Sequence, residues 1–214
     1  DEAMAIDKAI PGSDLIIIAI PVDATLQLLP GILDKLDKQV LMDVGSTKGL
    51  ICQAVSENKH RGRFVATHPM WGTEKDGPES VVKDAFKGRV AVICEKEKTD
   101  ADALQMVETL YSKIGMQLVY MDADVHDVHA AYVSHISHIA SYALSLTVLE
   151  KEKEEDAIFE LASGGFESTV RLAKSNPAMW VPIFMQNKEN VLDVLNEHIS
   201  QLRKIKSCLE KENF

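Results

Sequence analysis

Three apolar segments at a regular spacing constrain the fold of the first half of this chain. They begin about 25 residues apart, the spacing of a repeated strand and helix: 13–21 (SDLIIIAIP), 39–44 (QVLMDV) and 63–68 (RFVATH). The segments between them, 22–36 and 46–59, have helical composition, and Pro30–Gly31 interrupts the first. A continuous run of Ile is typical of a strand buried on both faces, and repeated βα units produce parallel strands. We therefore predict a parallel α/β sheet.

Two further strand signals extend this half of the chain. They lie at 89–95 (RVAVICE) and 116–122 (MQLVYMD), and they flank a helical segment at 100–115 that closes with Gly115. The alternation of strands and helices continues to residue 121, so we assign residues 1–121 to an α/β domain.

The pattern changes from residue 122 onward. Residues 125–156 contain neither Gly nor Pro and are helical in composition. Asn176–Pro177 indicates another helix start, because Asn suits the N-cap and Pro the first helical position. From there we expect one last helix, bent near Pro182, with apolar residues every three to four positions. Residues 122–214 are therefore predicted to form an all-helical domain, so that the fold class is α/β plus all-α.

Composition excludes several kinds of partner. The net charge is −10 and no block of Lys and Arg occurs, so we do not expect nucleic-acid binding. No apolar run approaches the roughly 20 residues of a membrane span, and no signal peptide is recognisable. The three cysteines are scattered, which fits reduced thiols and a cytoplasmic location.

Polar residues follow the second and third predicted strands. In an open parallel sheet, ligands bind beyond the carboxyl ends of the strands, which here are Ile20–Pro21, the segment around Ser46, and His68. A serine can hold a histidine by a hydrogen bond and fix its tautomer for acid–base chemistry. In the alternative, Gly45 and Gly49 merely bracket a helix start that Ser46 or Thr47 caps, and His68 belongs to a turn.

Four histidines of the helical half suggest a metal site at first sight. On a straight helix, with about 100° per residue, His126 and His135 lie about 180° apart, and so do His129 and His138. One metal ion could not bind all four, so we predict no metal. Each histidine is then a partly buried, hydrogen-bonded residue, and one of them facing the crevice would be enough for function.

Two other side chains of this half carry possible binding chemistry. Arg171 follows the Gly164–Gly165 break and could bind a carboxylate through two parallel hydrogen bonds, although a surface or interface ion pair is the alternative. Trp180, taken alone, indicates a core residue.

Four motifs in order resemble the prephenate dehydrogenase family, which includes arogenate-using enzymes. They are DVGSTKG (43–49), HPMWGTEKDG (68–77), HDVHAAYVSHISH (126–138) and GGFESTVRLAKSNPAMW (164–180), and the resemblance covers essentially the whole chain. It implies a Rossmann-type domain that binds NAD, or NADP, followed by a helical domain that forms a homodimer. The implied reaction, in tyrosine biosynthesis, is oxidative decarboxylation of prephenate to 4-hydroxyphenylpyruvate, driven by aromatisation.

The resemblance also implies roles for individual residues. His68 matches the catalytic histidine that accepts the proton of the ring hydroxyl, and Ser46 matches the serine that orients it beside the nicotinamide. His135 and Arg171 match substrate-binding residues, Arg171 through a carboxylate. The other implied positions are Ile20 and Pro21 at the cofactor, Glu74 and Trp180 in the pocket, and Gly164 and Gly165 in a loop that can reach the neighbouring subunit.

Two features depart from the family pattern. Ser168 stands where members often carry an aspartate, so Arg171 is less constrained or Glu167 takes over that role. The G-x-G-x-x-G loop is absent, and residues 15–20 resemble the fourth strand of a dinucleotide-binding fold. Truncation is the simplest account of its absence, and we expect the chain alone to bind NAD weakly or not at all and to be inactive.

Three alternatives stay open from the sequence. The enzyme could use arogenate, or it could be another dehydrogenase that acts on a hydroxy acid. Such enzymes usually place a lysine on the first long helix of the second domain, where this chain has histidines. Thirdly, the missing glycine loop is compatible with a non-catalytic dimerisation or regulatory module.

Overall fold

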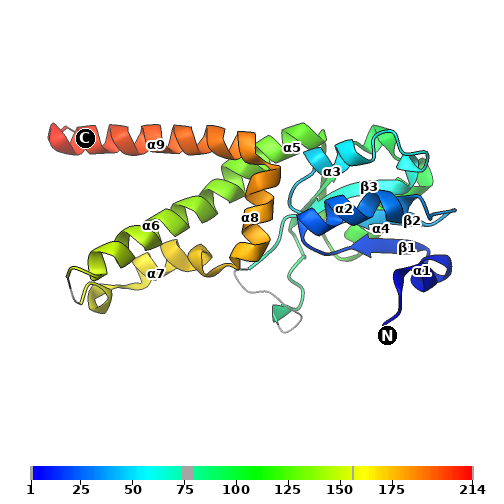
Figure 1. The fold of residues 1–214 in the computed structure, drawn as a ribbon, viewed down its shortest axis with the longest axis horizontal. Coiled ribbons are helices and arrows are strands. Elements are labelled where there is room, and N and C mark those ends of the chain that lie inside the picture. Colours follow the sequence, from blue (N-terminus) through cyan, green and yellow to red (C-terminus); the bar gives the residue numbers. More distant parts are fainter. Residues whose placement is uncertain (1, 74–79, 156, 214) are drawn as a thin grey trace.

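The computed structural model describes residues 2–73, 80–155 and 157–213. Within these residues, one sheet holds five strands in the order of the sequence (Figure 1). The strands are β1 (Leu15–Ile18), β2 (Val40–Asp43), β3 (Phe64–Pro69), β4 (Val90–Cys94) and β5 (Gln117–Met121). All five lie where the apolar patterns predict them.

The first three strands are parallel, as their spacing predicts. Ile18 pairs with Asp43, and Asp43 pairs with Ala66, so the strands end at one edge of the sheet. β4 runs antiparallel to β3, while β5 is parallel to β4. The sheet is therefore mixed, and its parallel part carries the edge where the polar strand ends meet.

Helices cover both faces of the sheet and create two buried clusters. Leu41 packs in the cluster of Leu33, which belongs to α2 (Val22–Leu33), with α3 (Gly49–Ala54) beside it. Val40 and Met42 point the other way, into the cluster of Val107 on α4 (Ala101–Lys113). This alternation explains why β2 is buried throughout. A short helix, α1 (Ile6–Ala9), precedes β1.

The second half is helical and extends away from the sheet (Figure 1). Its helices are α5 (Ala123–Ala130), α6 (Ile136–Glu152), α7 (Gly164–Val170), α8 (Pro177–Gln186) and α9 (Lys188–Glu210), with a π-helical turn at Ala131–His135 between α5 and α6. α8 stands on the sheet side of the diverging α6 and α9 and packs against α2, while α5 packs against α3. None of the helices in the described ranges is long and apolar enough to cross a membrane.

Three expectations about the helices were wrong. α2 continues through Pro30 and is not interrupted there. Proline has no backbone N–H, so the helix lacks one hydrogen-bond donor near its end. The expected last helix is in fact two helices, α8 and α9, which meet at Asn187. The Asn187 side chain donates a hydrogen bond to the backbone carbonyl of Asp127. The helix after residue 122 is not straight, because the π turn adds a residue to it. The N-cap at Asn176 is confirmed, since its side chain accepts the Ala178 N–H at 2.9 Å.

Candidate active site

A cavity lies between the sheet edge and α8. Its volume is about 500 Å³. The sheet half contributes Ile20 and Pro21 after β1 and Ser46 after β2, and α8 contributes Met179 and Ile183. The three residues expected at the cofactor therefore line one cavity, and its opposite wall comes from the helical half.

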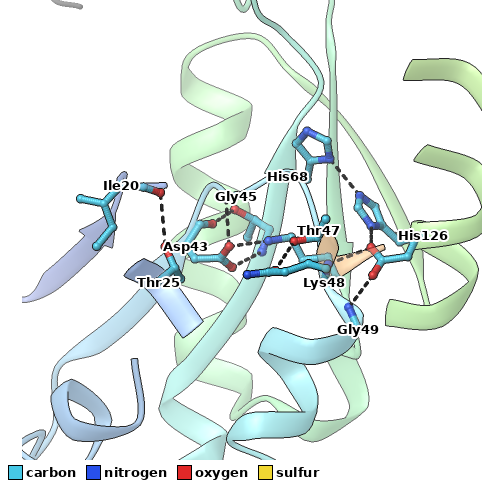
Figure 2. A network of polar contacts seen from close by, with 12 residues as sticks. Ile20, Thr25, Asp43, Gly45, Thr47, Lys48, Gly49, His68 and His126 are labelled. Atoms are coloured by element: carbon cyan, nitrogen blue, oxygen red, sulfur yellow. Dashed lines mark hydrogen bonds and ion pairs between the residues drawn. The ribbon is translucent and has the colours of Figure 1, made fainter. Parts of the chain in front are cut away.

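His68 lies at the end of β3 and is bonded to the helical half. Its Nδ1 is 2.9 Å from Nε2 of His126 on α5, and the two rings meet edge to face with centroids 5.1 Å apart. The Nδ1 of His126 is 2.8 Å from Oδ1 of Asp127. The hydrogen bond found for His68 is thus to His126, rather than to Ser46 as the sequence analysis expected (Figure 2).

Asp127 also joins the helical half to the loop after β2. Its Oδ1 accepts the backbone N–H of Lys48 and its Oδ2 accepts that of Gly49, both at 2.8 Å. These are the first amides of α3, a helix that has no side-chain cap of its own. Asp127 therefore caps α3 from a distant part of the sequence, at the end where a carboxylate is favoured.

A buried ion pair supports the same loop from beneath. Asp43 at the end of β2 and Lys48 are both fully buried, and their side chains form a short ion pair. The Asp43 carboxylate also accepts the Gly45 N–H, at 2.9 Å, and the Thr67 N–H, at 3.2 Å. This network joins the end of β2 to the loop that follows it and to the end of β3 (Figure 2).

Burial opposes a positive charge on His68 and on His135. Burial lowers the pKa of His68 well below its ordinary value, and His126, Lys48 and His135 lower this pKa further. Burial also lowers the pKa of His135 to about 4, although the Asp127 carboxylate opposes this shift. A neutral imidazole has a free lone pair, which a general base requires.

His135 belongs to a group of aromatic and amide side chains between α5 and α8. Its Nδ1 accepts a hydrogen bond from Asn187 Nδ2 at 3.2 Å, and its ring meets Trp180 edge to face at 6.1 Å. His138 stacks on Trp180 with ring centroids 3.4 Å apart. Trp180 is buried, and its indole N–H has no hydrogen-bond partner among the described residues.

The remaining expected site residues lie farther along the chain. Arg171 begins a 3-10 turn (Arg171–Lys174) and is close enough to His138 to lower the pKa of that histidine. Gly164 and Gly165 begin α7, which lies beside α6 and far from the sheet (Figure 1). Glu74 lies outside the described residues.

The π turn corrects the metal argument. The additional residue rotates the later side chains by about 100°, so His126 and His135 are no longer on opposite sides of the helix. Both are buried and both act on His68, whereas His129 is exposed. Within the described part of the chain, no group of three or more metal-binding side chains occurs.

Three residues of this site had no specific role predicted from the sequence. His126 was expected as one of four partly buried, hydrogen-bonded histidines, and neither Asp127 nor Asn187 was singled out. The adjacent pair His126–Asp127 was the available signal, because a buried histidine and a buried carboxylate next to each other tend to form a hydrogen bond. Nothing in the local sequence marks Asn187.

Family models match both halves of the chain. The nucleotide-binding domain of prephenate dehydrogenase matches residues 1–120, and the prephenate dehydrogenase dimerization domain matches residues 122–214. The prephenate dehydrogenase of Bacillus subtilis is 30% identical over 216 residues, which cover 100% of this chain and 58% of that protein. A cyclohexadienyl dehydrogenase of Zymomonas mobilis is 28% identical over 97% of this chain and 72% of its own length.

A solved structure agrees with the fold. The prephenate dehydrogenase from Aquifex aeolicus, crystallised with hydroxyphenyl propionate and NAD+, is 30% identical, with a TM-score of 0.85 over 98% of this chain and 74% of that one. This chain thus spans less than two thirds of the Bacillus relative and about three quarters of the Aquifex structure. Since the two family models together match nearly every residue, the chain belongs to the prephenate dehydrogenase family.

Proposed function

We propose that this chain carries the catalytic base and the substrate site of an NAD-dependent prephenate dehydrogenase. The enzyme removes a hydride from the ring carbon that bears the hydroxyl, CO₂ leaves, and 4-hydroxyphenylpyruvate forms. The observation that carries the proposal is the position of His68. It ends β3 at the sheet edge where ligands of parallel α/β folds bind, and its environment keeps it neutral.

His68 is proposed as the general base. A neutral imidazole can accept the hydroxyl proton as the carbon–hydrogen bond breaks, and a base in this position contributes roughly 10²- to 10⁴-fold to a rate. Ser46 lines the cavity beyond β2 and β1, where it can contact both substrate and cofactor. We propose contact with the ligands for Ser46, in place of a bond that orients His68.

The cavity fits one end of the cofactor. NAD supplies the hydride acceptor when it is bound, and Ile20, Pro21 and Ser46 would hold the nicotinamide end, because they line an apolar wall at the carboxyl ends of β1 and β2. The glycine loop that would hold the pyrophosphate is not in this sequence. NAD is proposed over NADP on the strength of the Aquifex relative, which was crystallised with NAD+.

The substrate would lie between His68 and the group around His135. Prephenate carries two carboxylates and this protein has a net charge of −10, so binding requires a local cation. We propose Arg171 for one carboxylate, His135 for contact with the substrate, and Glu74 and Trp180 as pocket-lining residues. Gly164 and Gly165 are proposed to reach the site of a partner subunit, since they lie far from their own sheet.

We also propose a homodimer through the helical half. The dimerization-domain model matches this half, and α6 and α9 leave large apolar side chains exposed, namely Leu146, Leu149, Leu202, Ile205 and Leu209. A glutamate at Ile205 should halve the mass measured by light scattering. The same change at Leu28, an exposed leucine on α2, is the matched control and should leave the dimer intact.

The activity test uses the protein with any residues that its gene encodes before Asp1. Absorbance at the NADH wavelength should rise with prephenate, and a His68→Asn variant should lose roughly 10²- to 10⁴-fold in kcat. Arogenate and NADP, tested in parallel, identify the other substrate and cofactor if they are preferred. If the folded wild-type protein is inactive with prephenate and with arogenate, each tested with NAD and with NADP, the non-catalytic alternative is favoured instead.

A further inference from the structure

The contacts of His68 point to a role for two residues of α5. We propose that Asp127 and His126 are positioning residues that fix the tautomer of His68, so that its Nε2 is the free base. This inference rests on the proposed function, because it concerns the same histidine. Two bonds carry it: His68 Nδ1 to His126 Nε2 at 2.9 Å, and His126 Nδ1 to Asp127 Oδ1 at 2.8 Å.

The direction of these bonds follows from the partners of Asp127. Its two oxygens accept backbone N–H groups from Lys48 and Gly49, which can only donate. The carboxylate is therefore an acceptor toward all its neighbours, and the Nδ1 of His126 must donate to it. In its neutral form the His126 imidazole carries one proton, so its Nε2 is left as an acceptor.

The tautomer of His68 is then determined. Since Nε2 of His126 accepts, Nδ1 of His68 must donate, and the lone pair of His68 lies on Nε2. In Figure 2 this second nitrogen lies on the side of the ring away from His126. When the substrate hydroxyl gives up its proton, the proton binds His68 Nε2 and stays there. The Nδ1–H bond remains in place, and the Asp127 carboxylate stabilises the new positive charge through His126.

Among the described residues, the charged and titratable groups that act on His68 are His126, Lys48 and His135. Lys48 is already paired with Asp43. His135 bonds Asn187 through its Nδ1. The only contact found for His68 Nδ1 in the described part of the chain is the one to His126.

The arrangement leaves little room for displacement. A side-chain carbon added at Gly49 would lie 3.0 Å from Asp127 Oδ2 and 3.3 Å from Asp124 Oδ1. The carboxylate is therefore held between the loop after β2 and its own helix. Because β3 and α5 belong to different halves, the position of the base depends on how the halves contact each other.

The first experiment reads the tautomer directly and needs no turnover. The 214-residue chain is labelled with ¹⁵N-histidine, and the His68 signals are assigned by their loss in His68→Asn. Near neutral pH, Nδ1 should show the shift of a protonated nitrogen and Nε2 that of an unprotonated one. His126→Phe should give the mixed tautomers of a free imidazole. The exposed His129→Gln on the same helix is the matched control and should leave the His68 shifts unchanged.

The second experiment measures turnover in the intact enzyme. His126→Phe and Asp127→Asn should each lower kcat roughly 10- to 100-fold, as loss of an orienting partner does, with KM for prephenate changed by less than about threefold. His126→Gln keeps an oxygen acceptor near the former Nε2 and should recover part of the loss. The variant with glutamine is also the safeguard if the phenylalanine variant fails to fold.

The outcomes separate this inference from the proposed function. Full turnover in His68→Asn would refute the role of His68 as the general base, and the positioning role of His126 and Asp127 would be refuted with it. Loss of turnover in His68→Asn, with unchanged kcat in folded His126→Phe or His126→Gln, would overturn the positioning role alone. An unprotonated Nδ1 on His68 in the wild-type chain would overturn it as well, whatever the kinetics show.

Discussion

The burial of His135 makes the stability of this fold depend on pH in a way that can be calculated. Its pKa is about 4 in the folded protein, against the ordinary value of 6.5 that applies when the chain is unfolded. The unfolded chain therefore binds this proton more tightly. The contribution to stability is complete above pH 6.5 and is lost as the pH falls toward 4. Between about pH 7.5 and about pH 5, His135 alone should cost about 2 kcal/mol of unfolding free energy.

The structure also explains which change removes this dependence. Nδ1 of His135 accepts a hydrogen bond from Asn187, and the ring is 1% exposed, so a proton would break the bond and bury a charge. In His135→Gln a side-chain oxygen can still accept from Asn187, and no titratable group remains. The variant should lose contact with Trp180 and be less stable near neutral pH, but its stability should fall less with acid.

The assay is urea unfolding at the two pH values, followed by far-ultraviolet circular dichroism. The loss on acidification should be about 2 kcal/mol smaller in His135→Gln than in the wild type. His68 and His138 are present in both proteins, so their lowered pKa values enter both losses. The control His129→Gln should behave as the wild type. Parallel pH curves for the wild type and His135→Gln would refute the argument that burial keeps His135 neutral.

Three further measurements test other contacts. Lys48→Met leaves the buried carboxylate of Asp43 without its cation and should cost roughly 3–5 kcal/mol in urea unfolding; a loss below 1 would contradict the pairing. Gly49→Ala pushes a carbon against Asp127, so its melting temperature should fall, while Gly31→Ala, with nothing within 4 Å, should keep or raise it. Calorimetric titration of the 214-residue chain with NAD should find no micromolar affinity, because the glycine loop is absent; clear micromolar binding would refute this.

The strand positions were predictable because a short run of apolar residues indicates a strand that is buried in the sheet. β2 is buried at every residue, and its sequence, VLMD, is apolar until the last position. The direction of β4 was not predictable in this way. Its pattern of apolar residues would be the same in either direction, and only its pairing with β3 distinguishes them.

The geometry of the histidines depended on one local irregularity. Counting residues on an ideal helix places His126 and His135 on opposite sides, and the π turn at Ala131–His135 brings both toward His68. Helical composition carries no record of such a turn, because the five residues involved are compatible with an ordinary helix. His126 and His135 were therefore both named from the sequence, but the hydrogen bond to His68 was expected from Ser46 and the one found is with His126.

Asp127 illustrates why charged residues are the hardest to interpret from sequence. An aspartate in a helix is most often solvated, and burial becomes favourable only when donors from elsewhere satisfy it. Here those donors are the first amides of α3, from residues 48 and 49, which the fold brings to α5. No local pattern contains this information, since the partners are separated by 79 and 78 residues.

The same separation explains how the two halves share one site. The sheet half supplies His68 and one wall of the cavity, while the helical half supplies the hydrogen-bond partner of His68 and the other wall. Neither half alone would fix the tautomer of His68, because α5 provides its only described partner. It follows that changes at the contact between α3 and α5 should act on turnover through the base, even where they touch neither substrate nor cofactor.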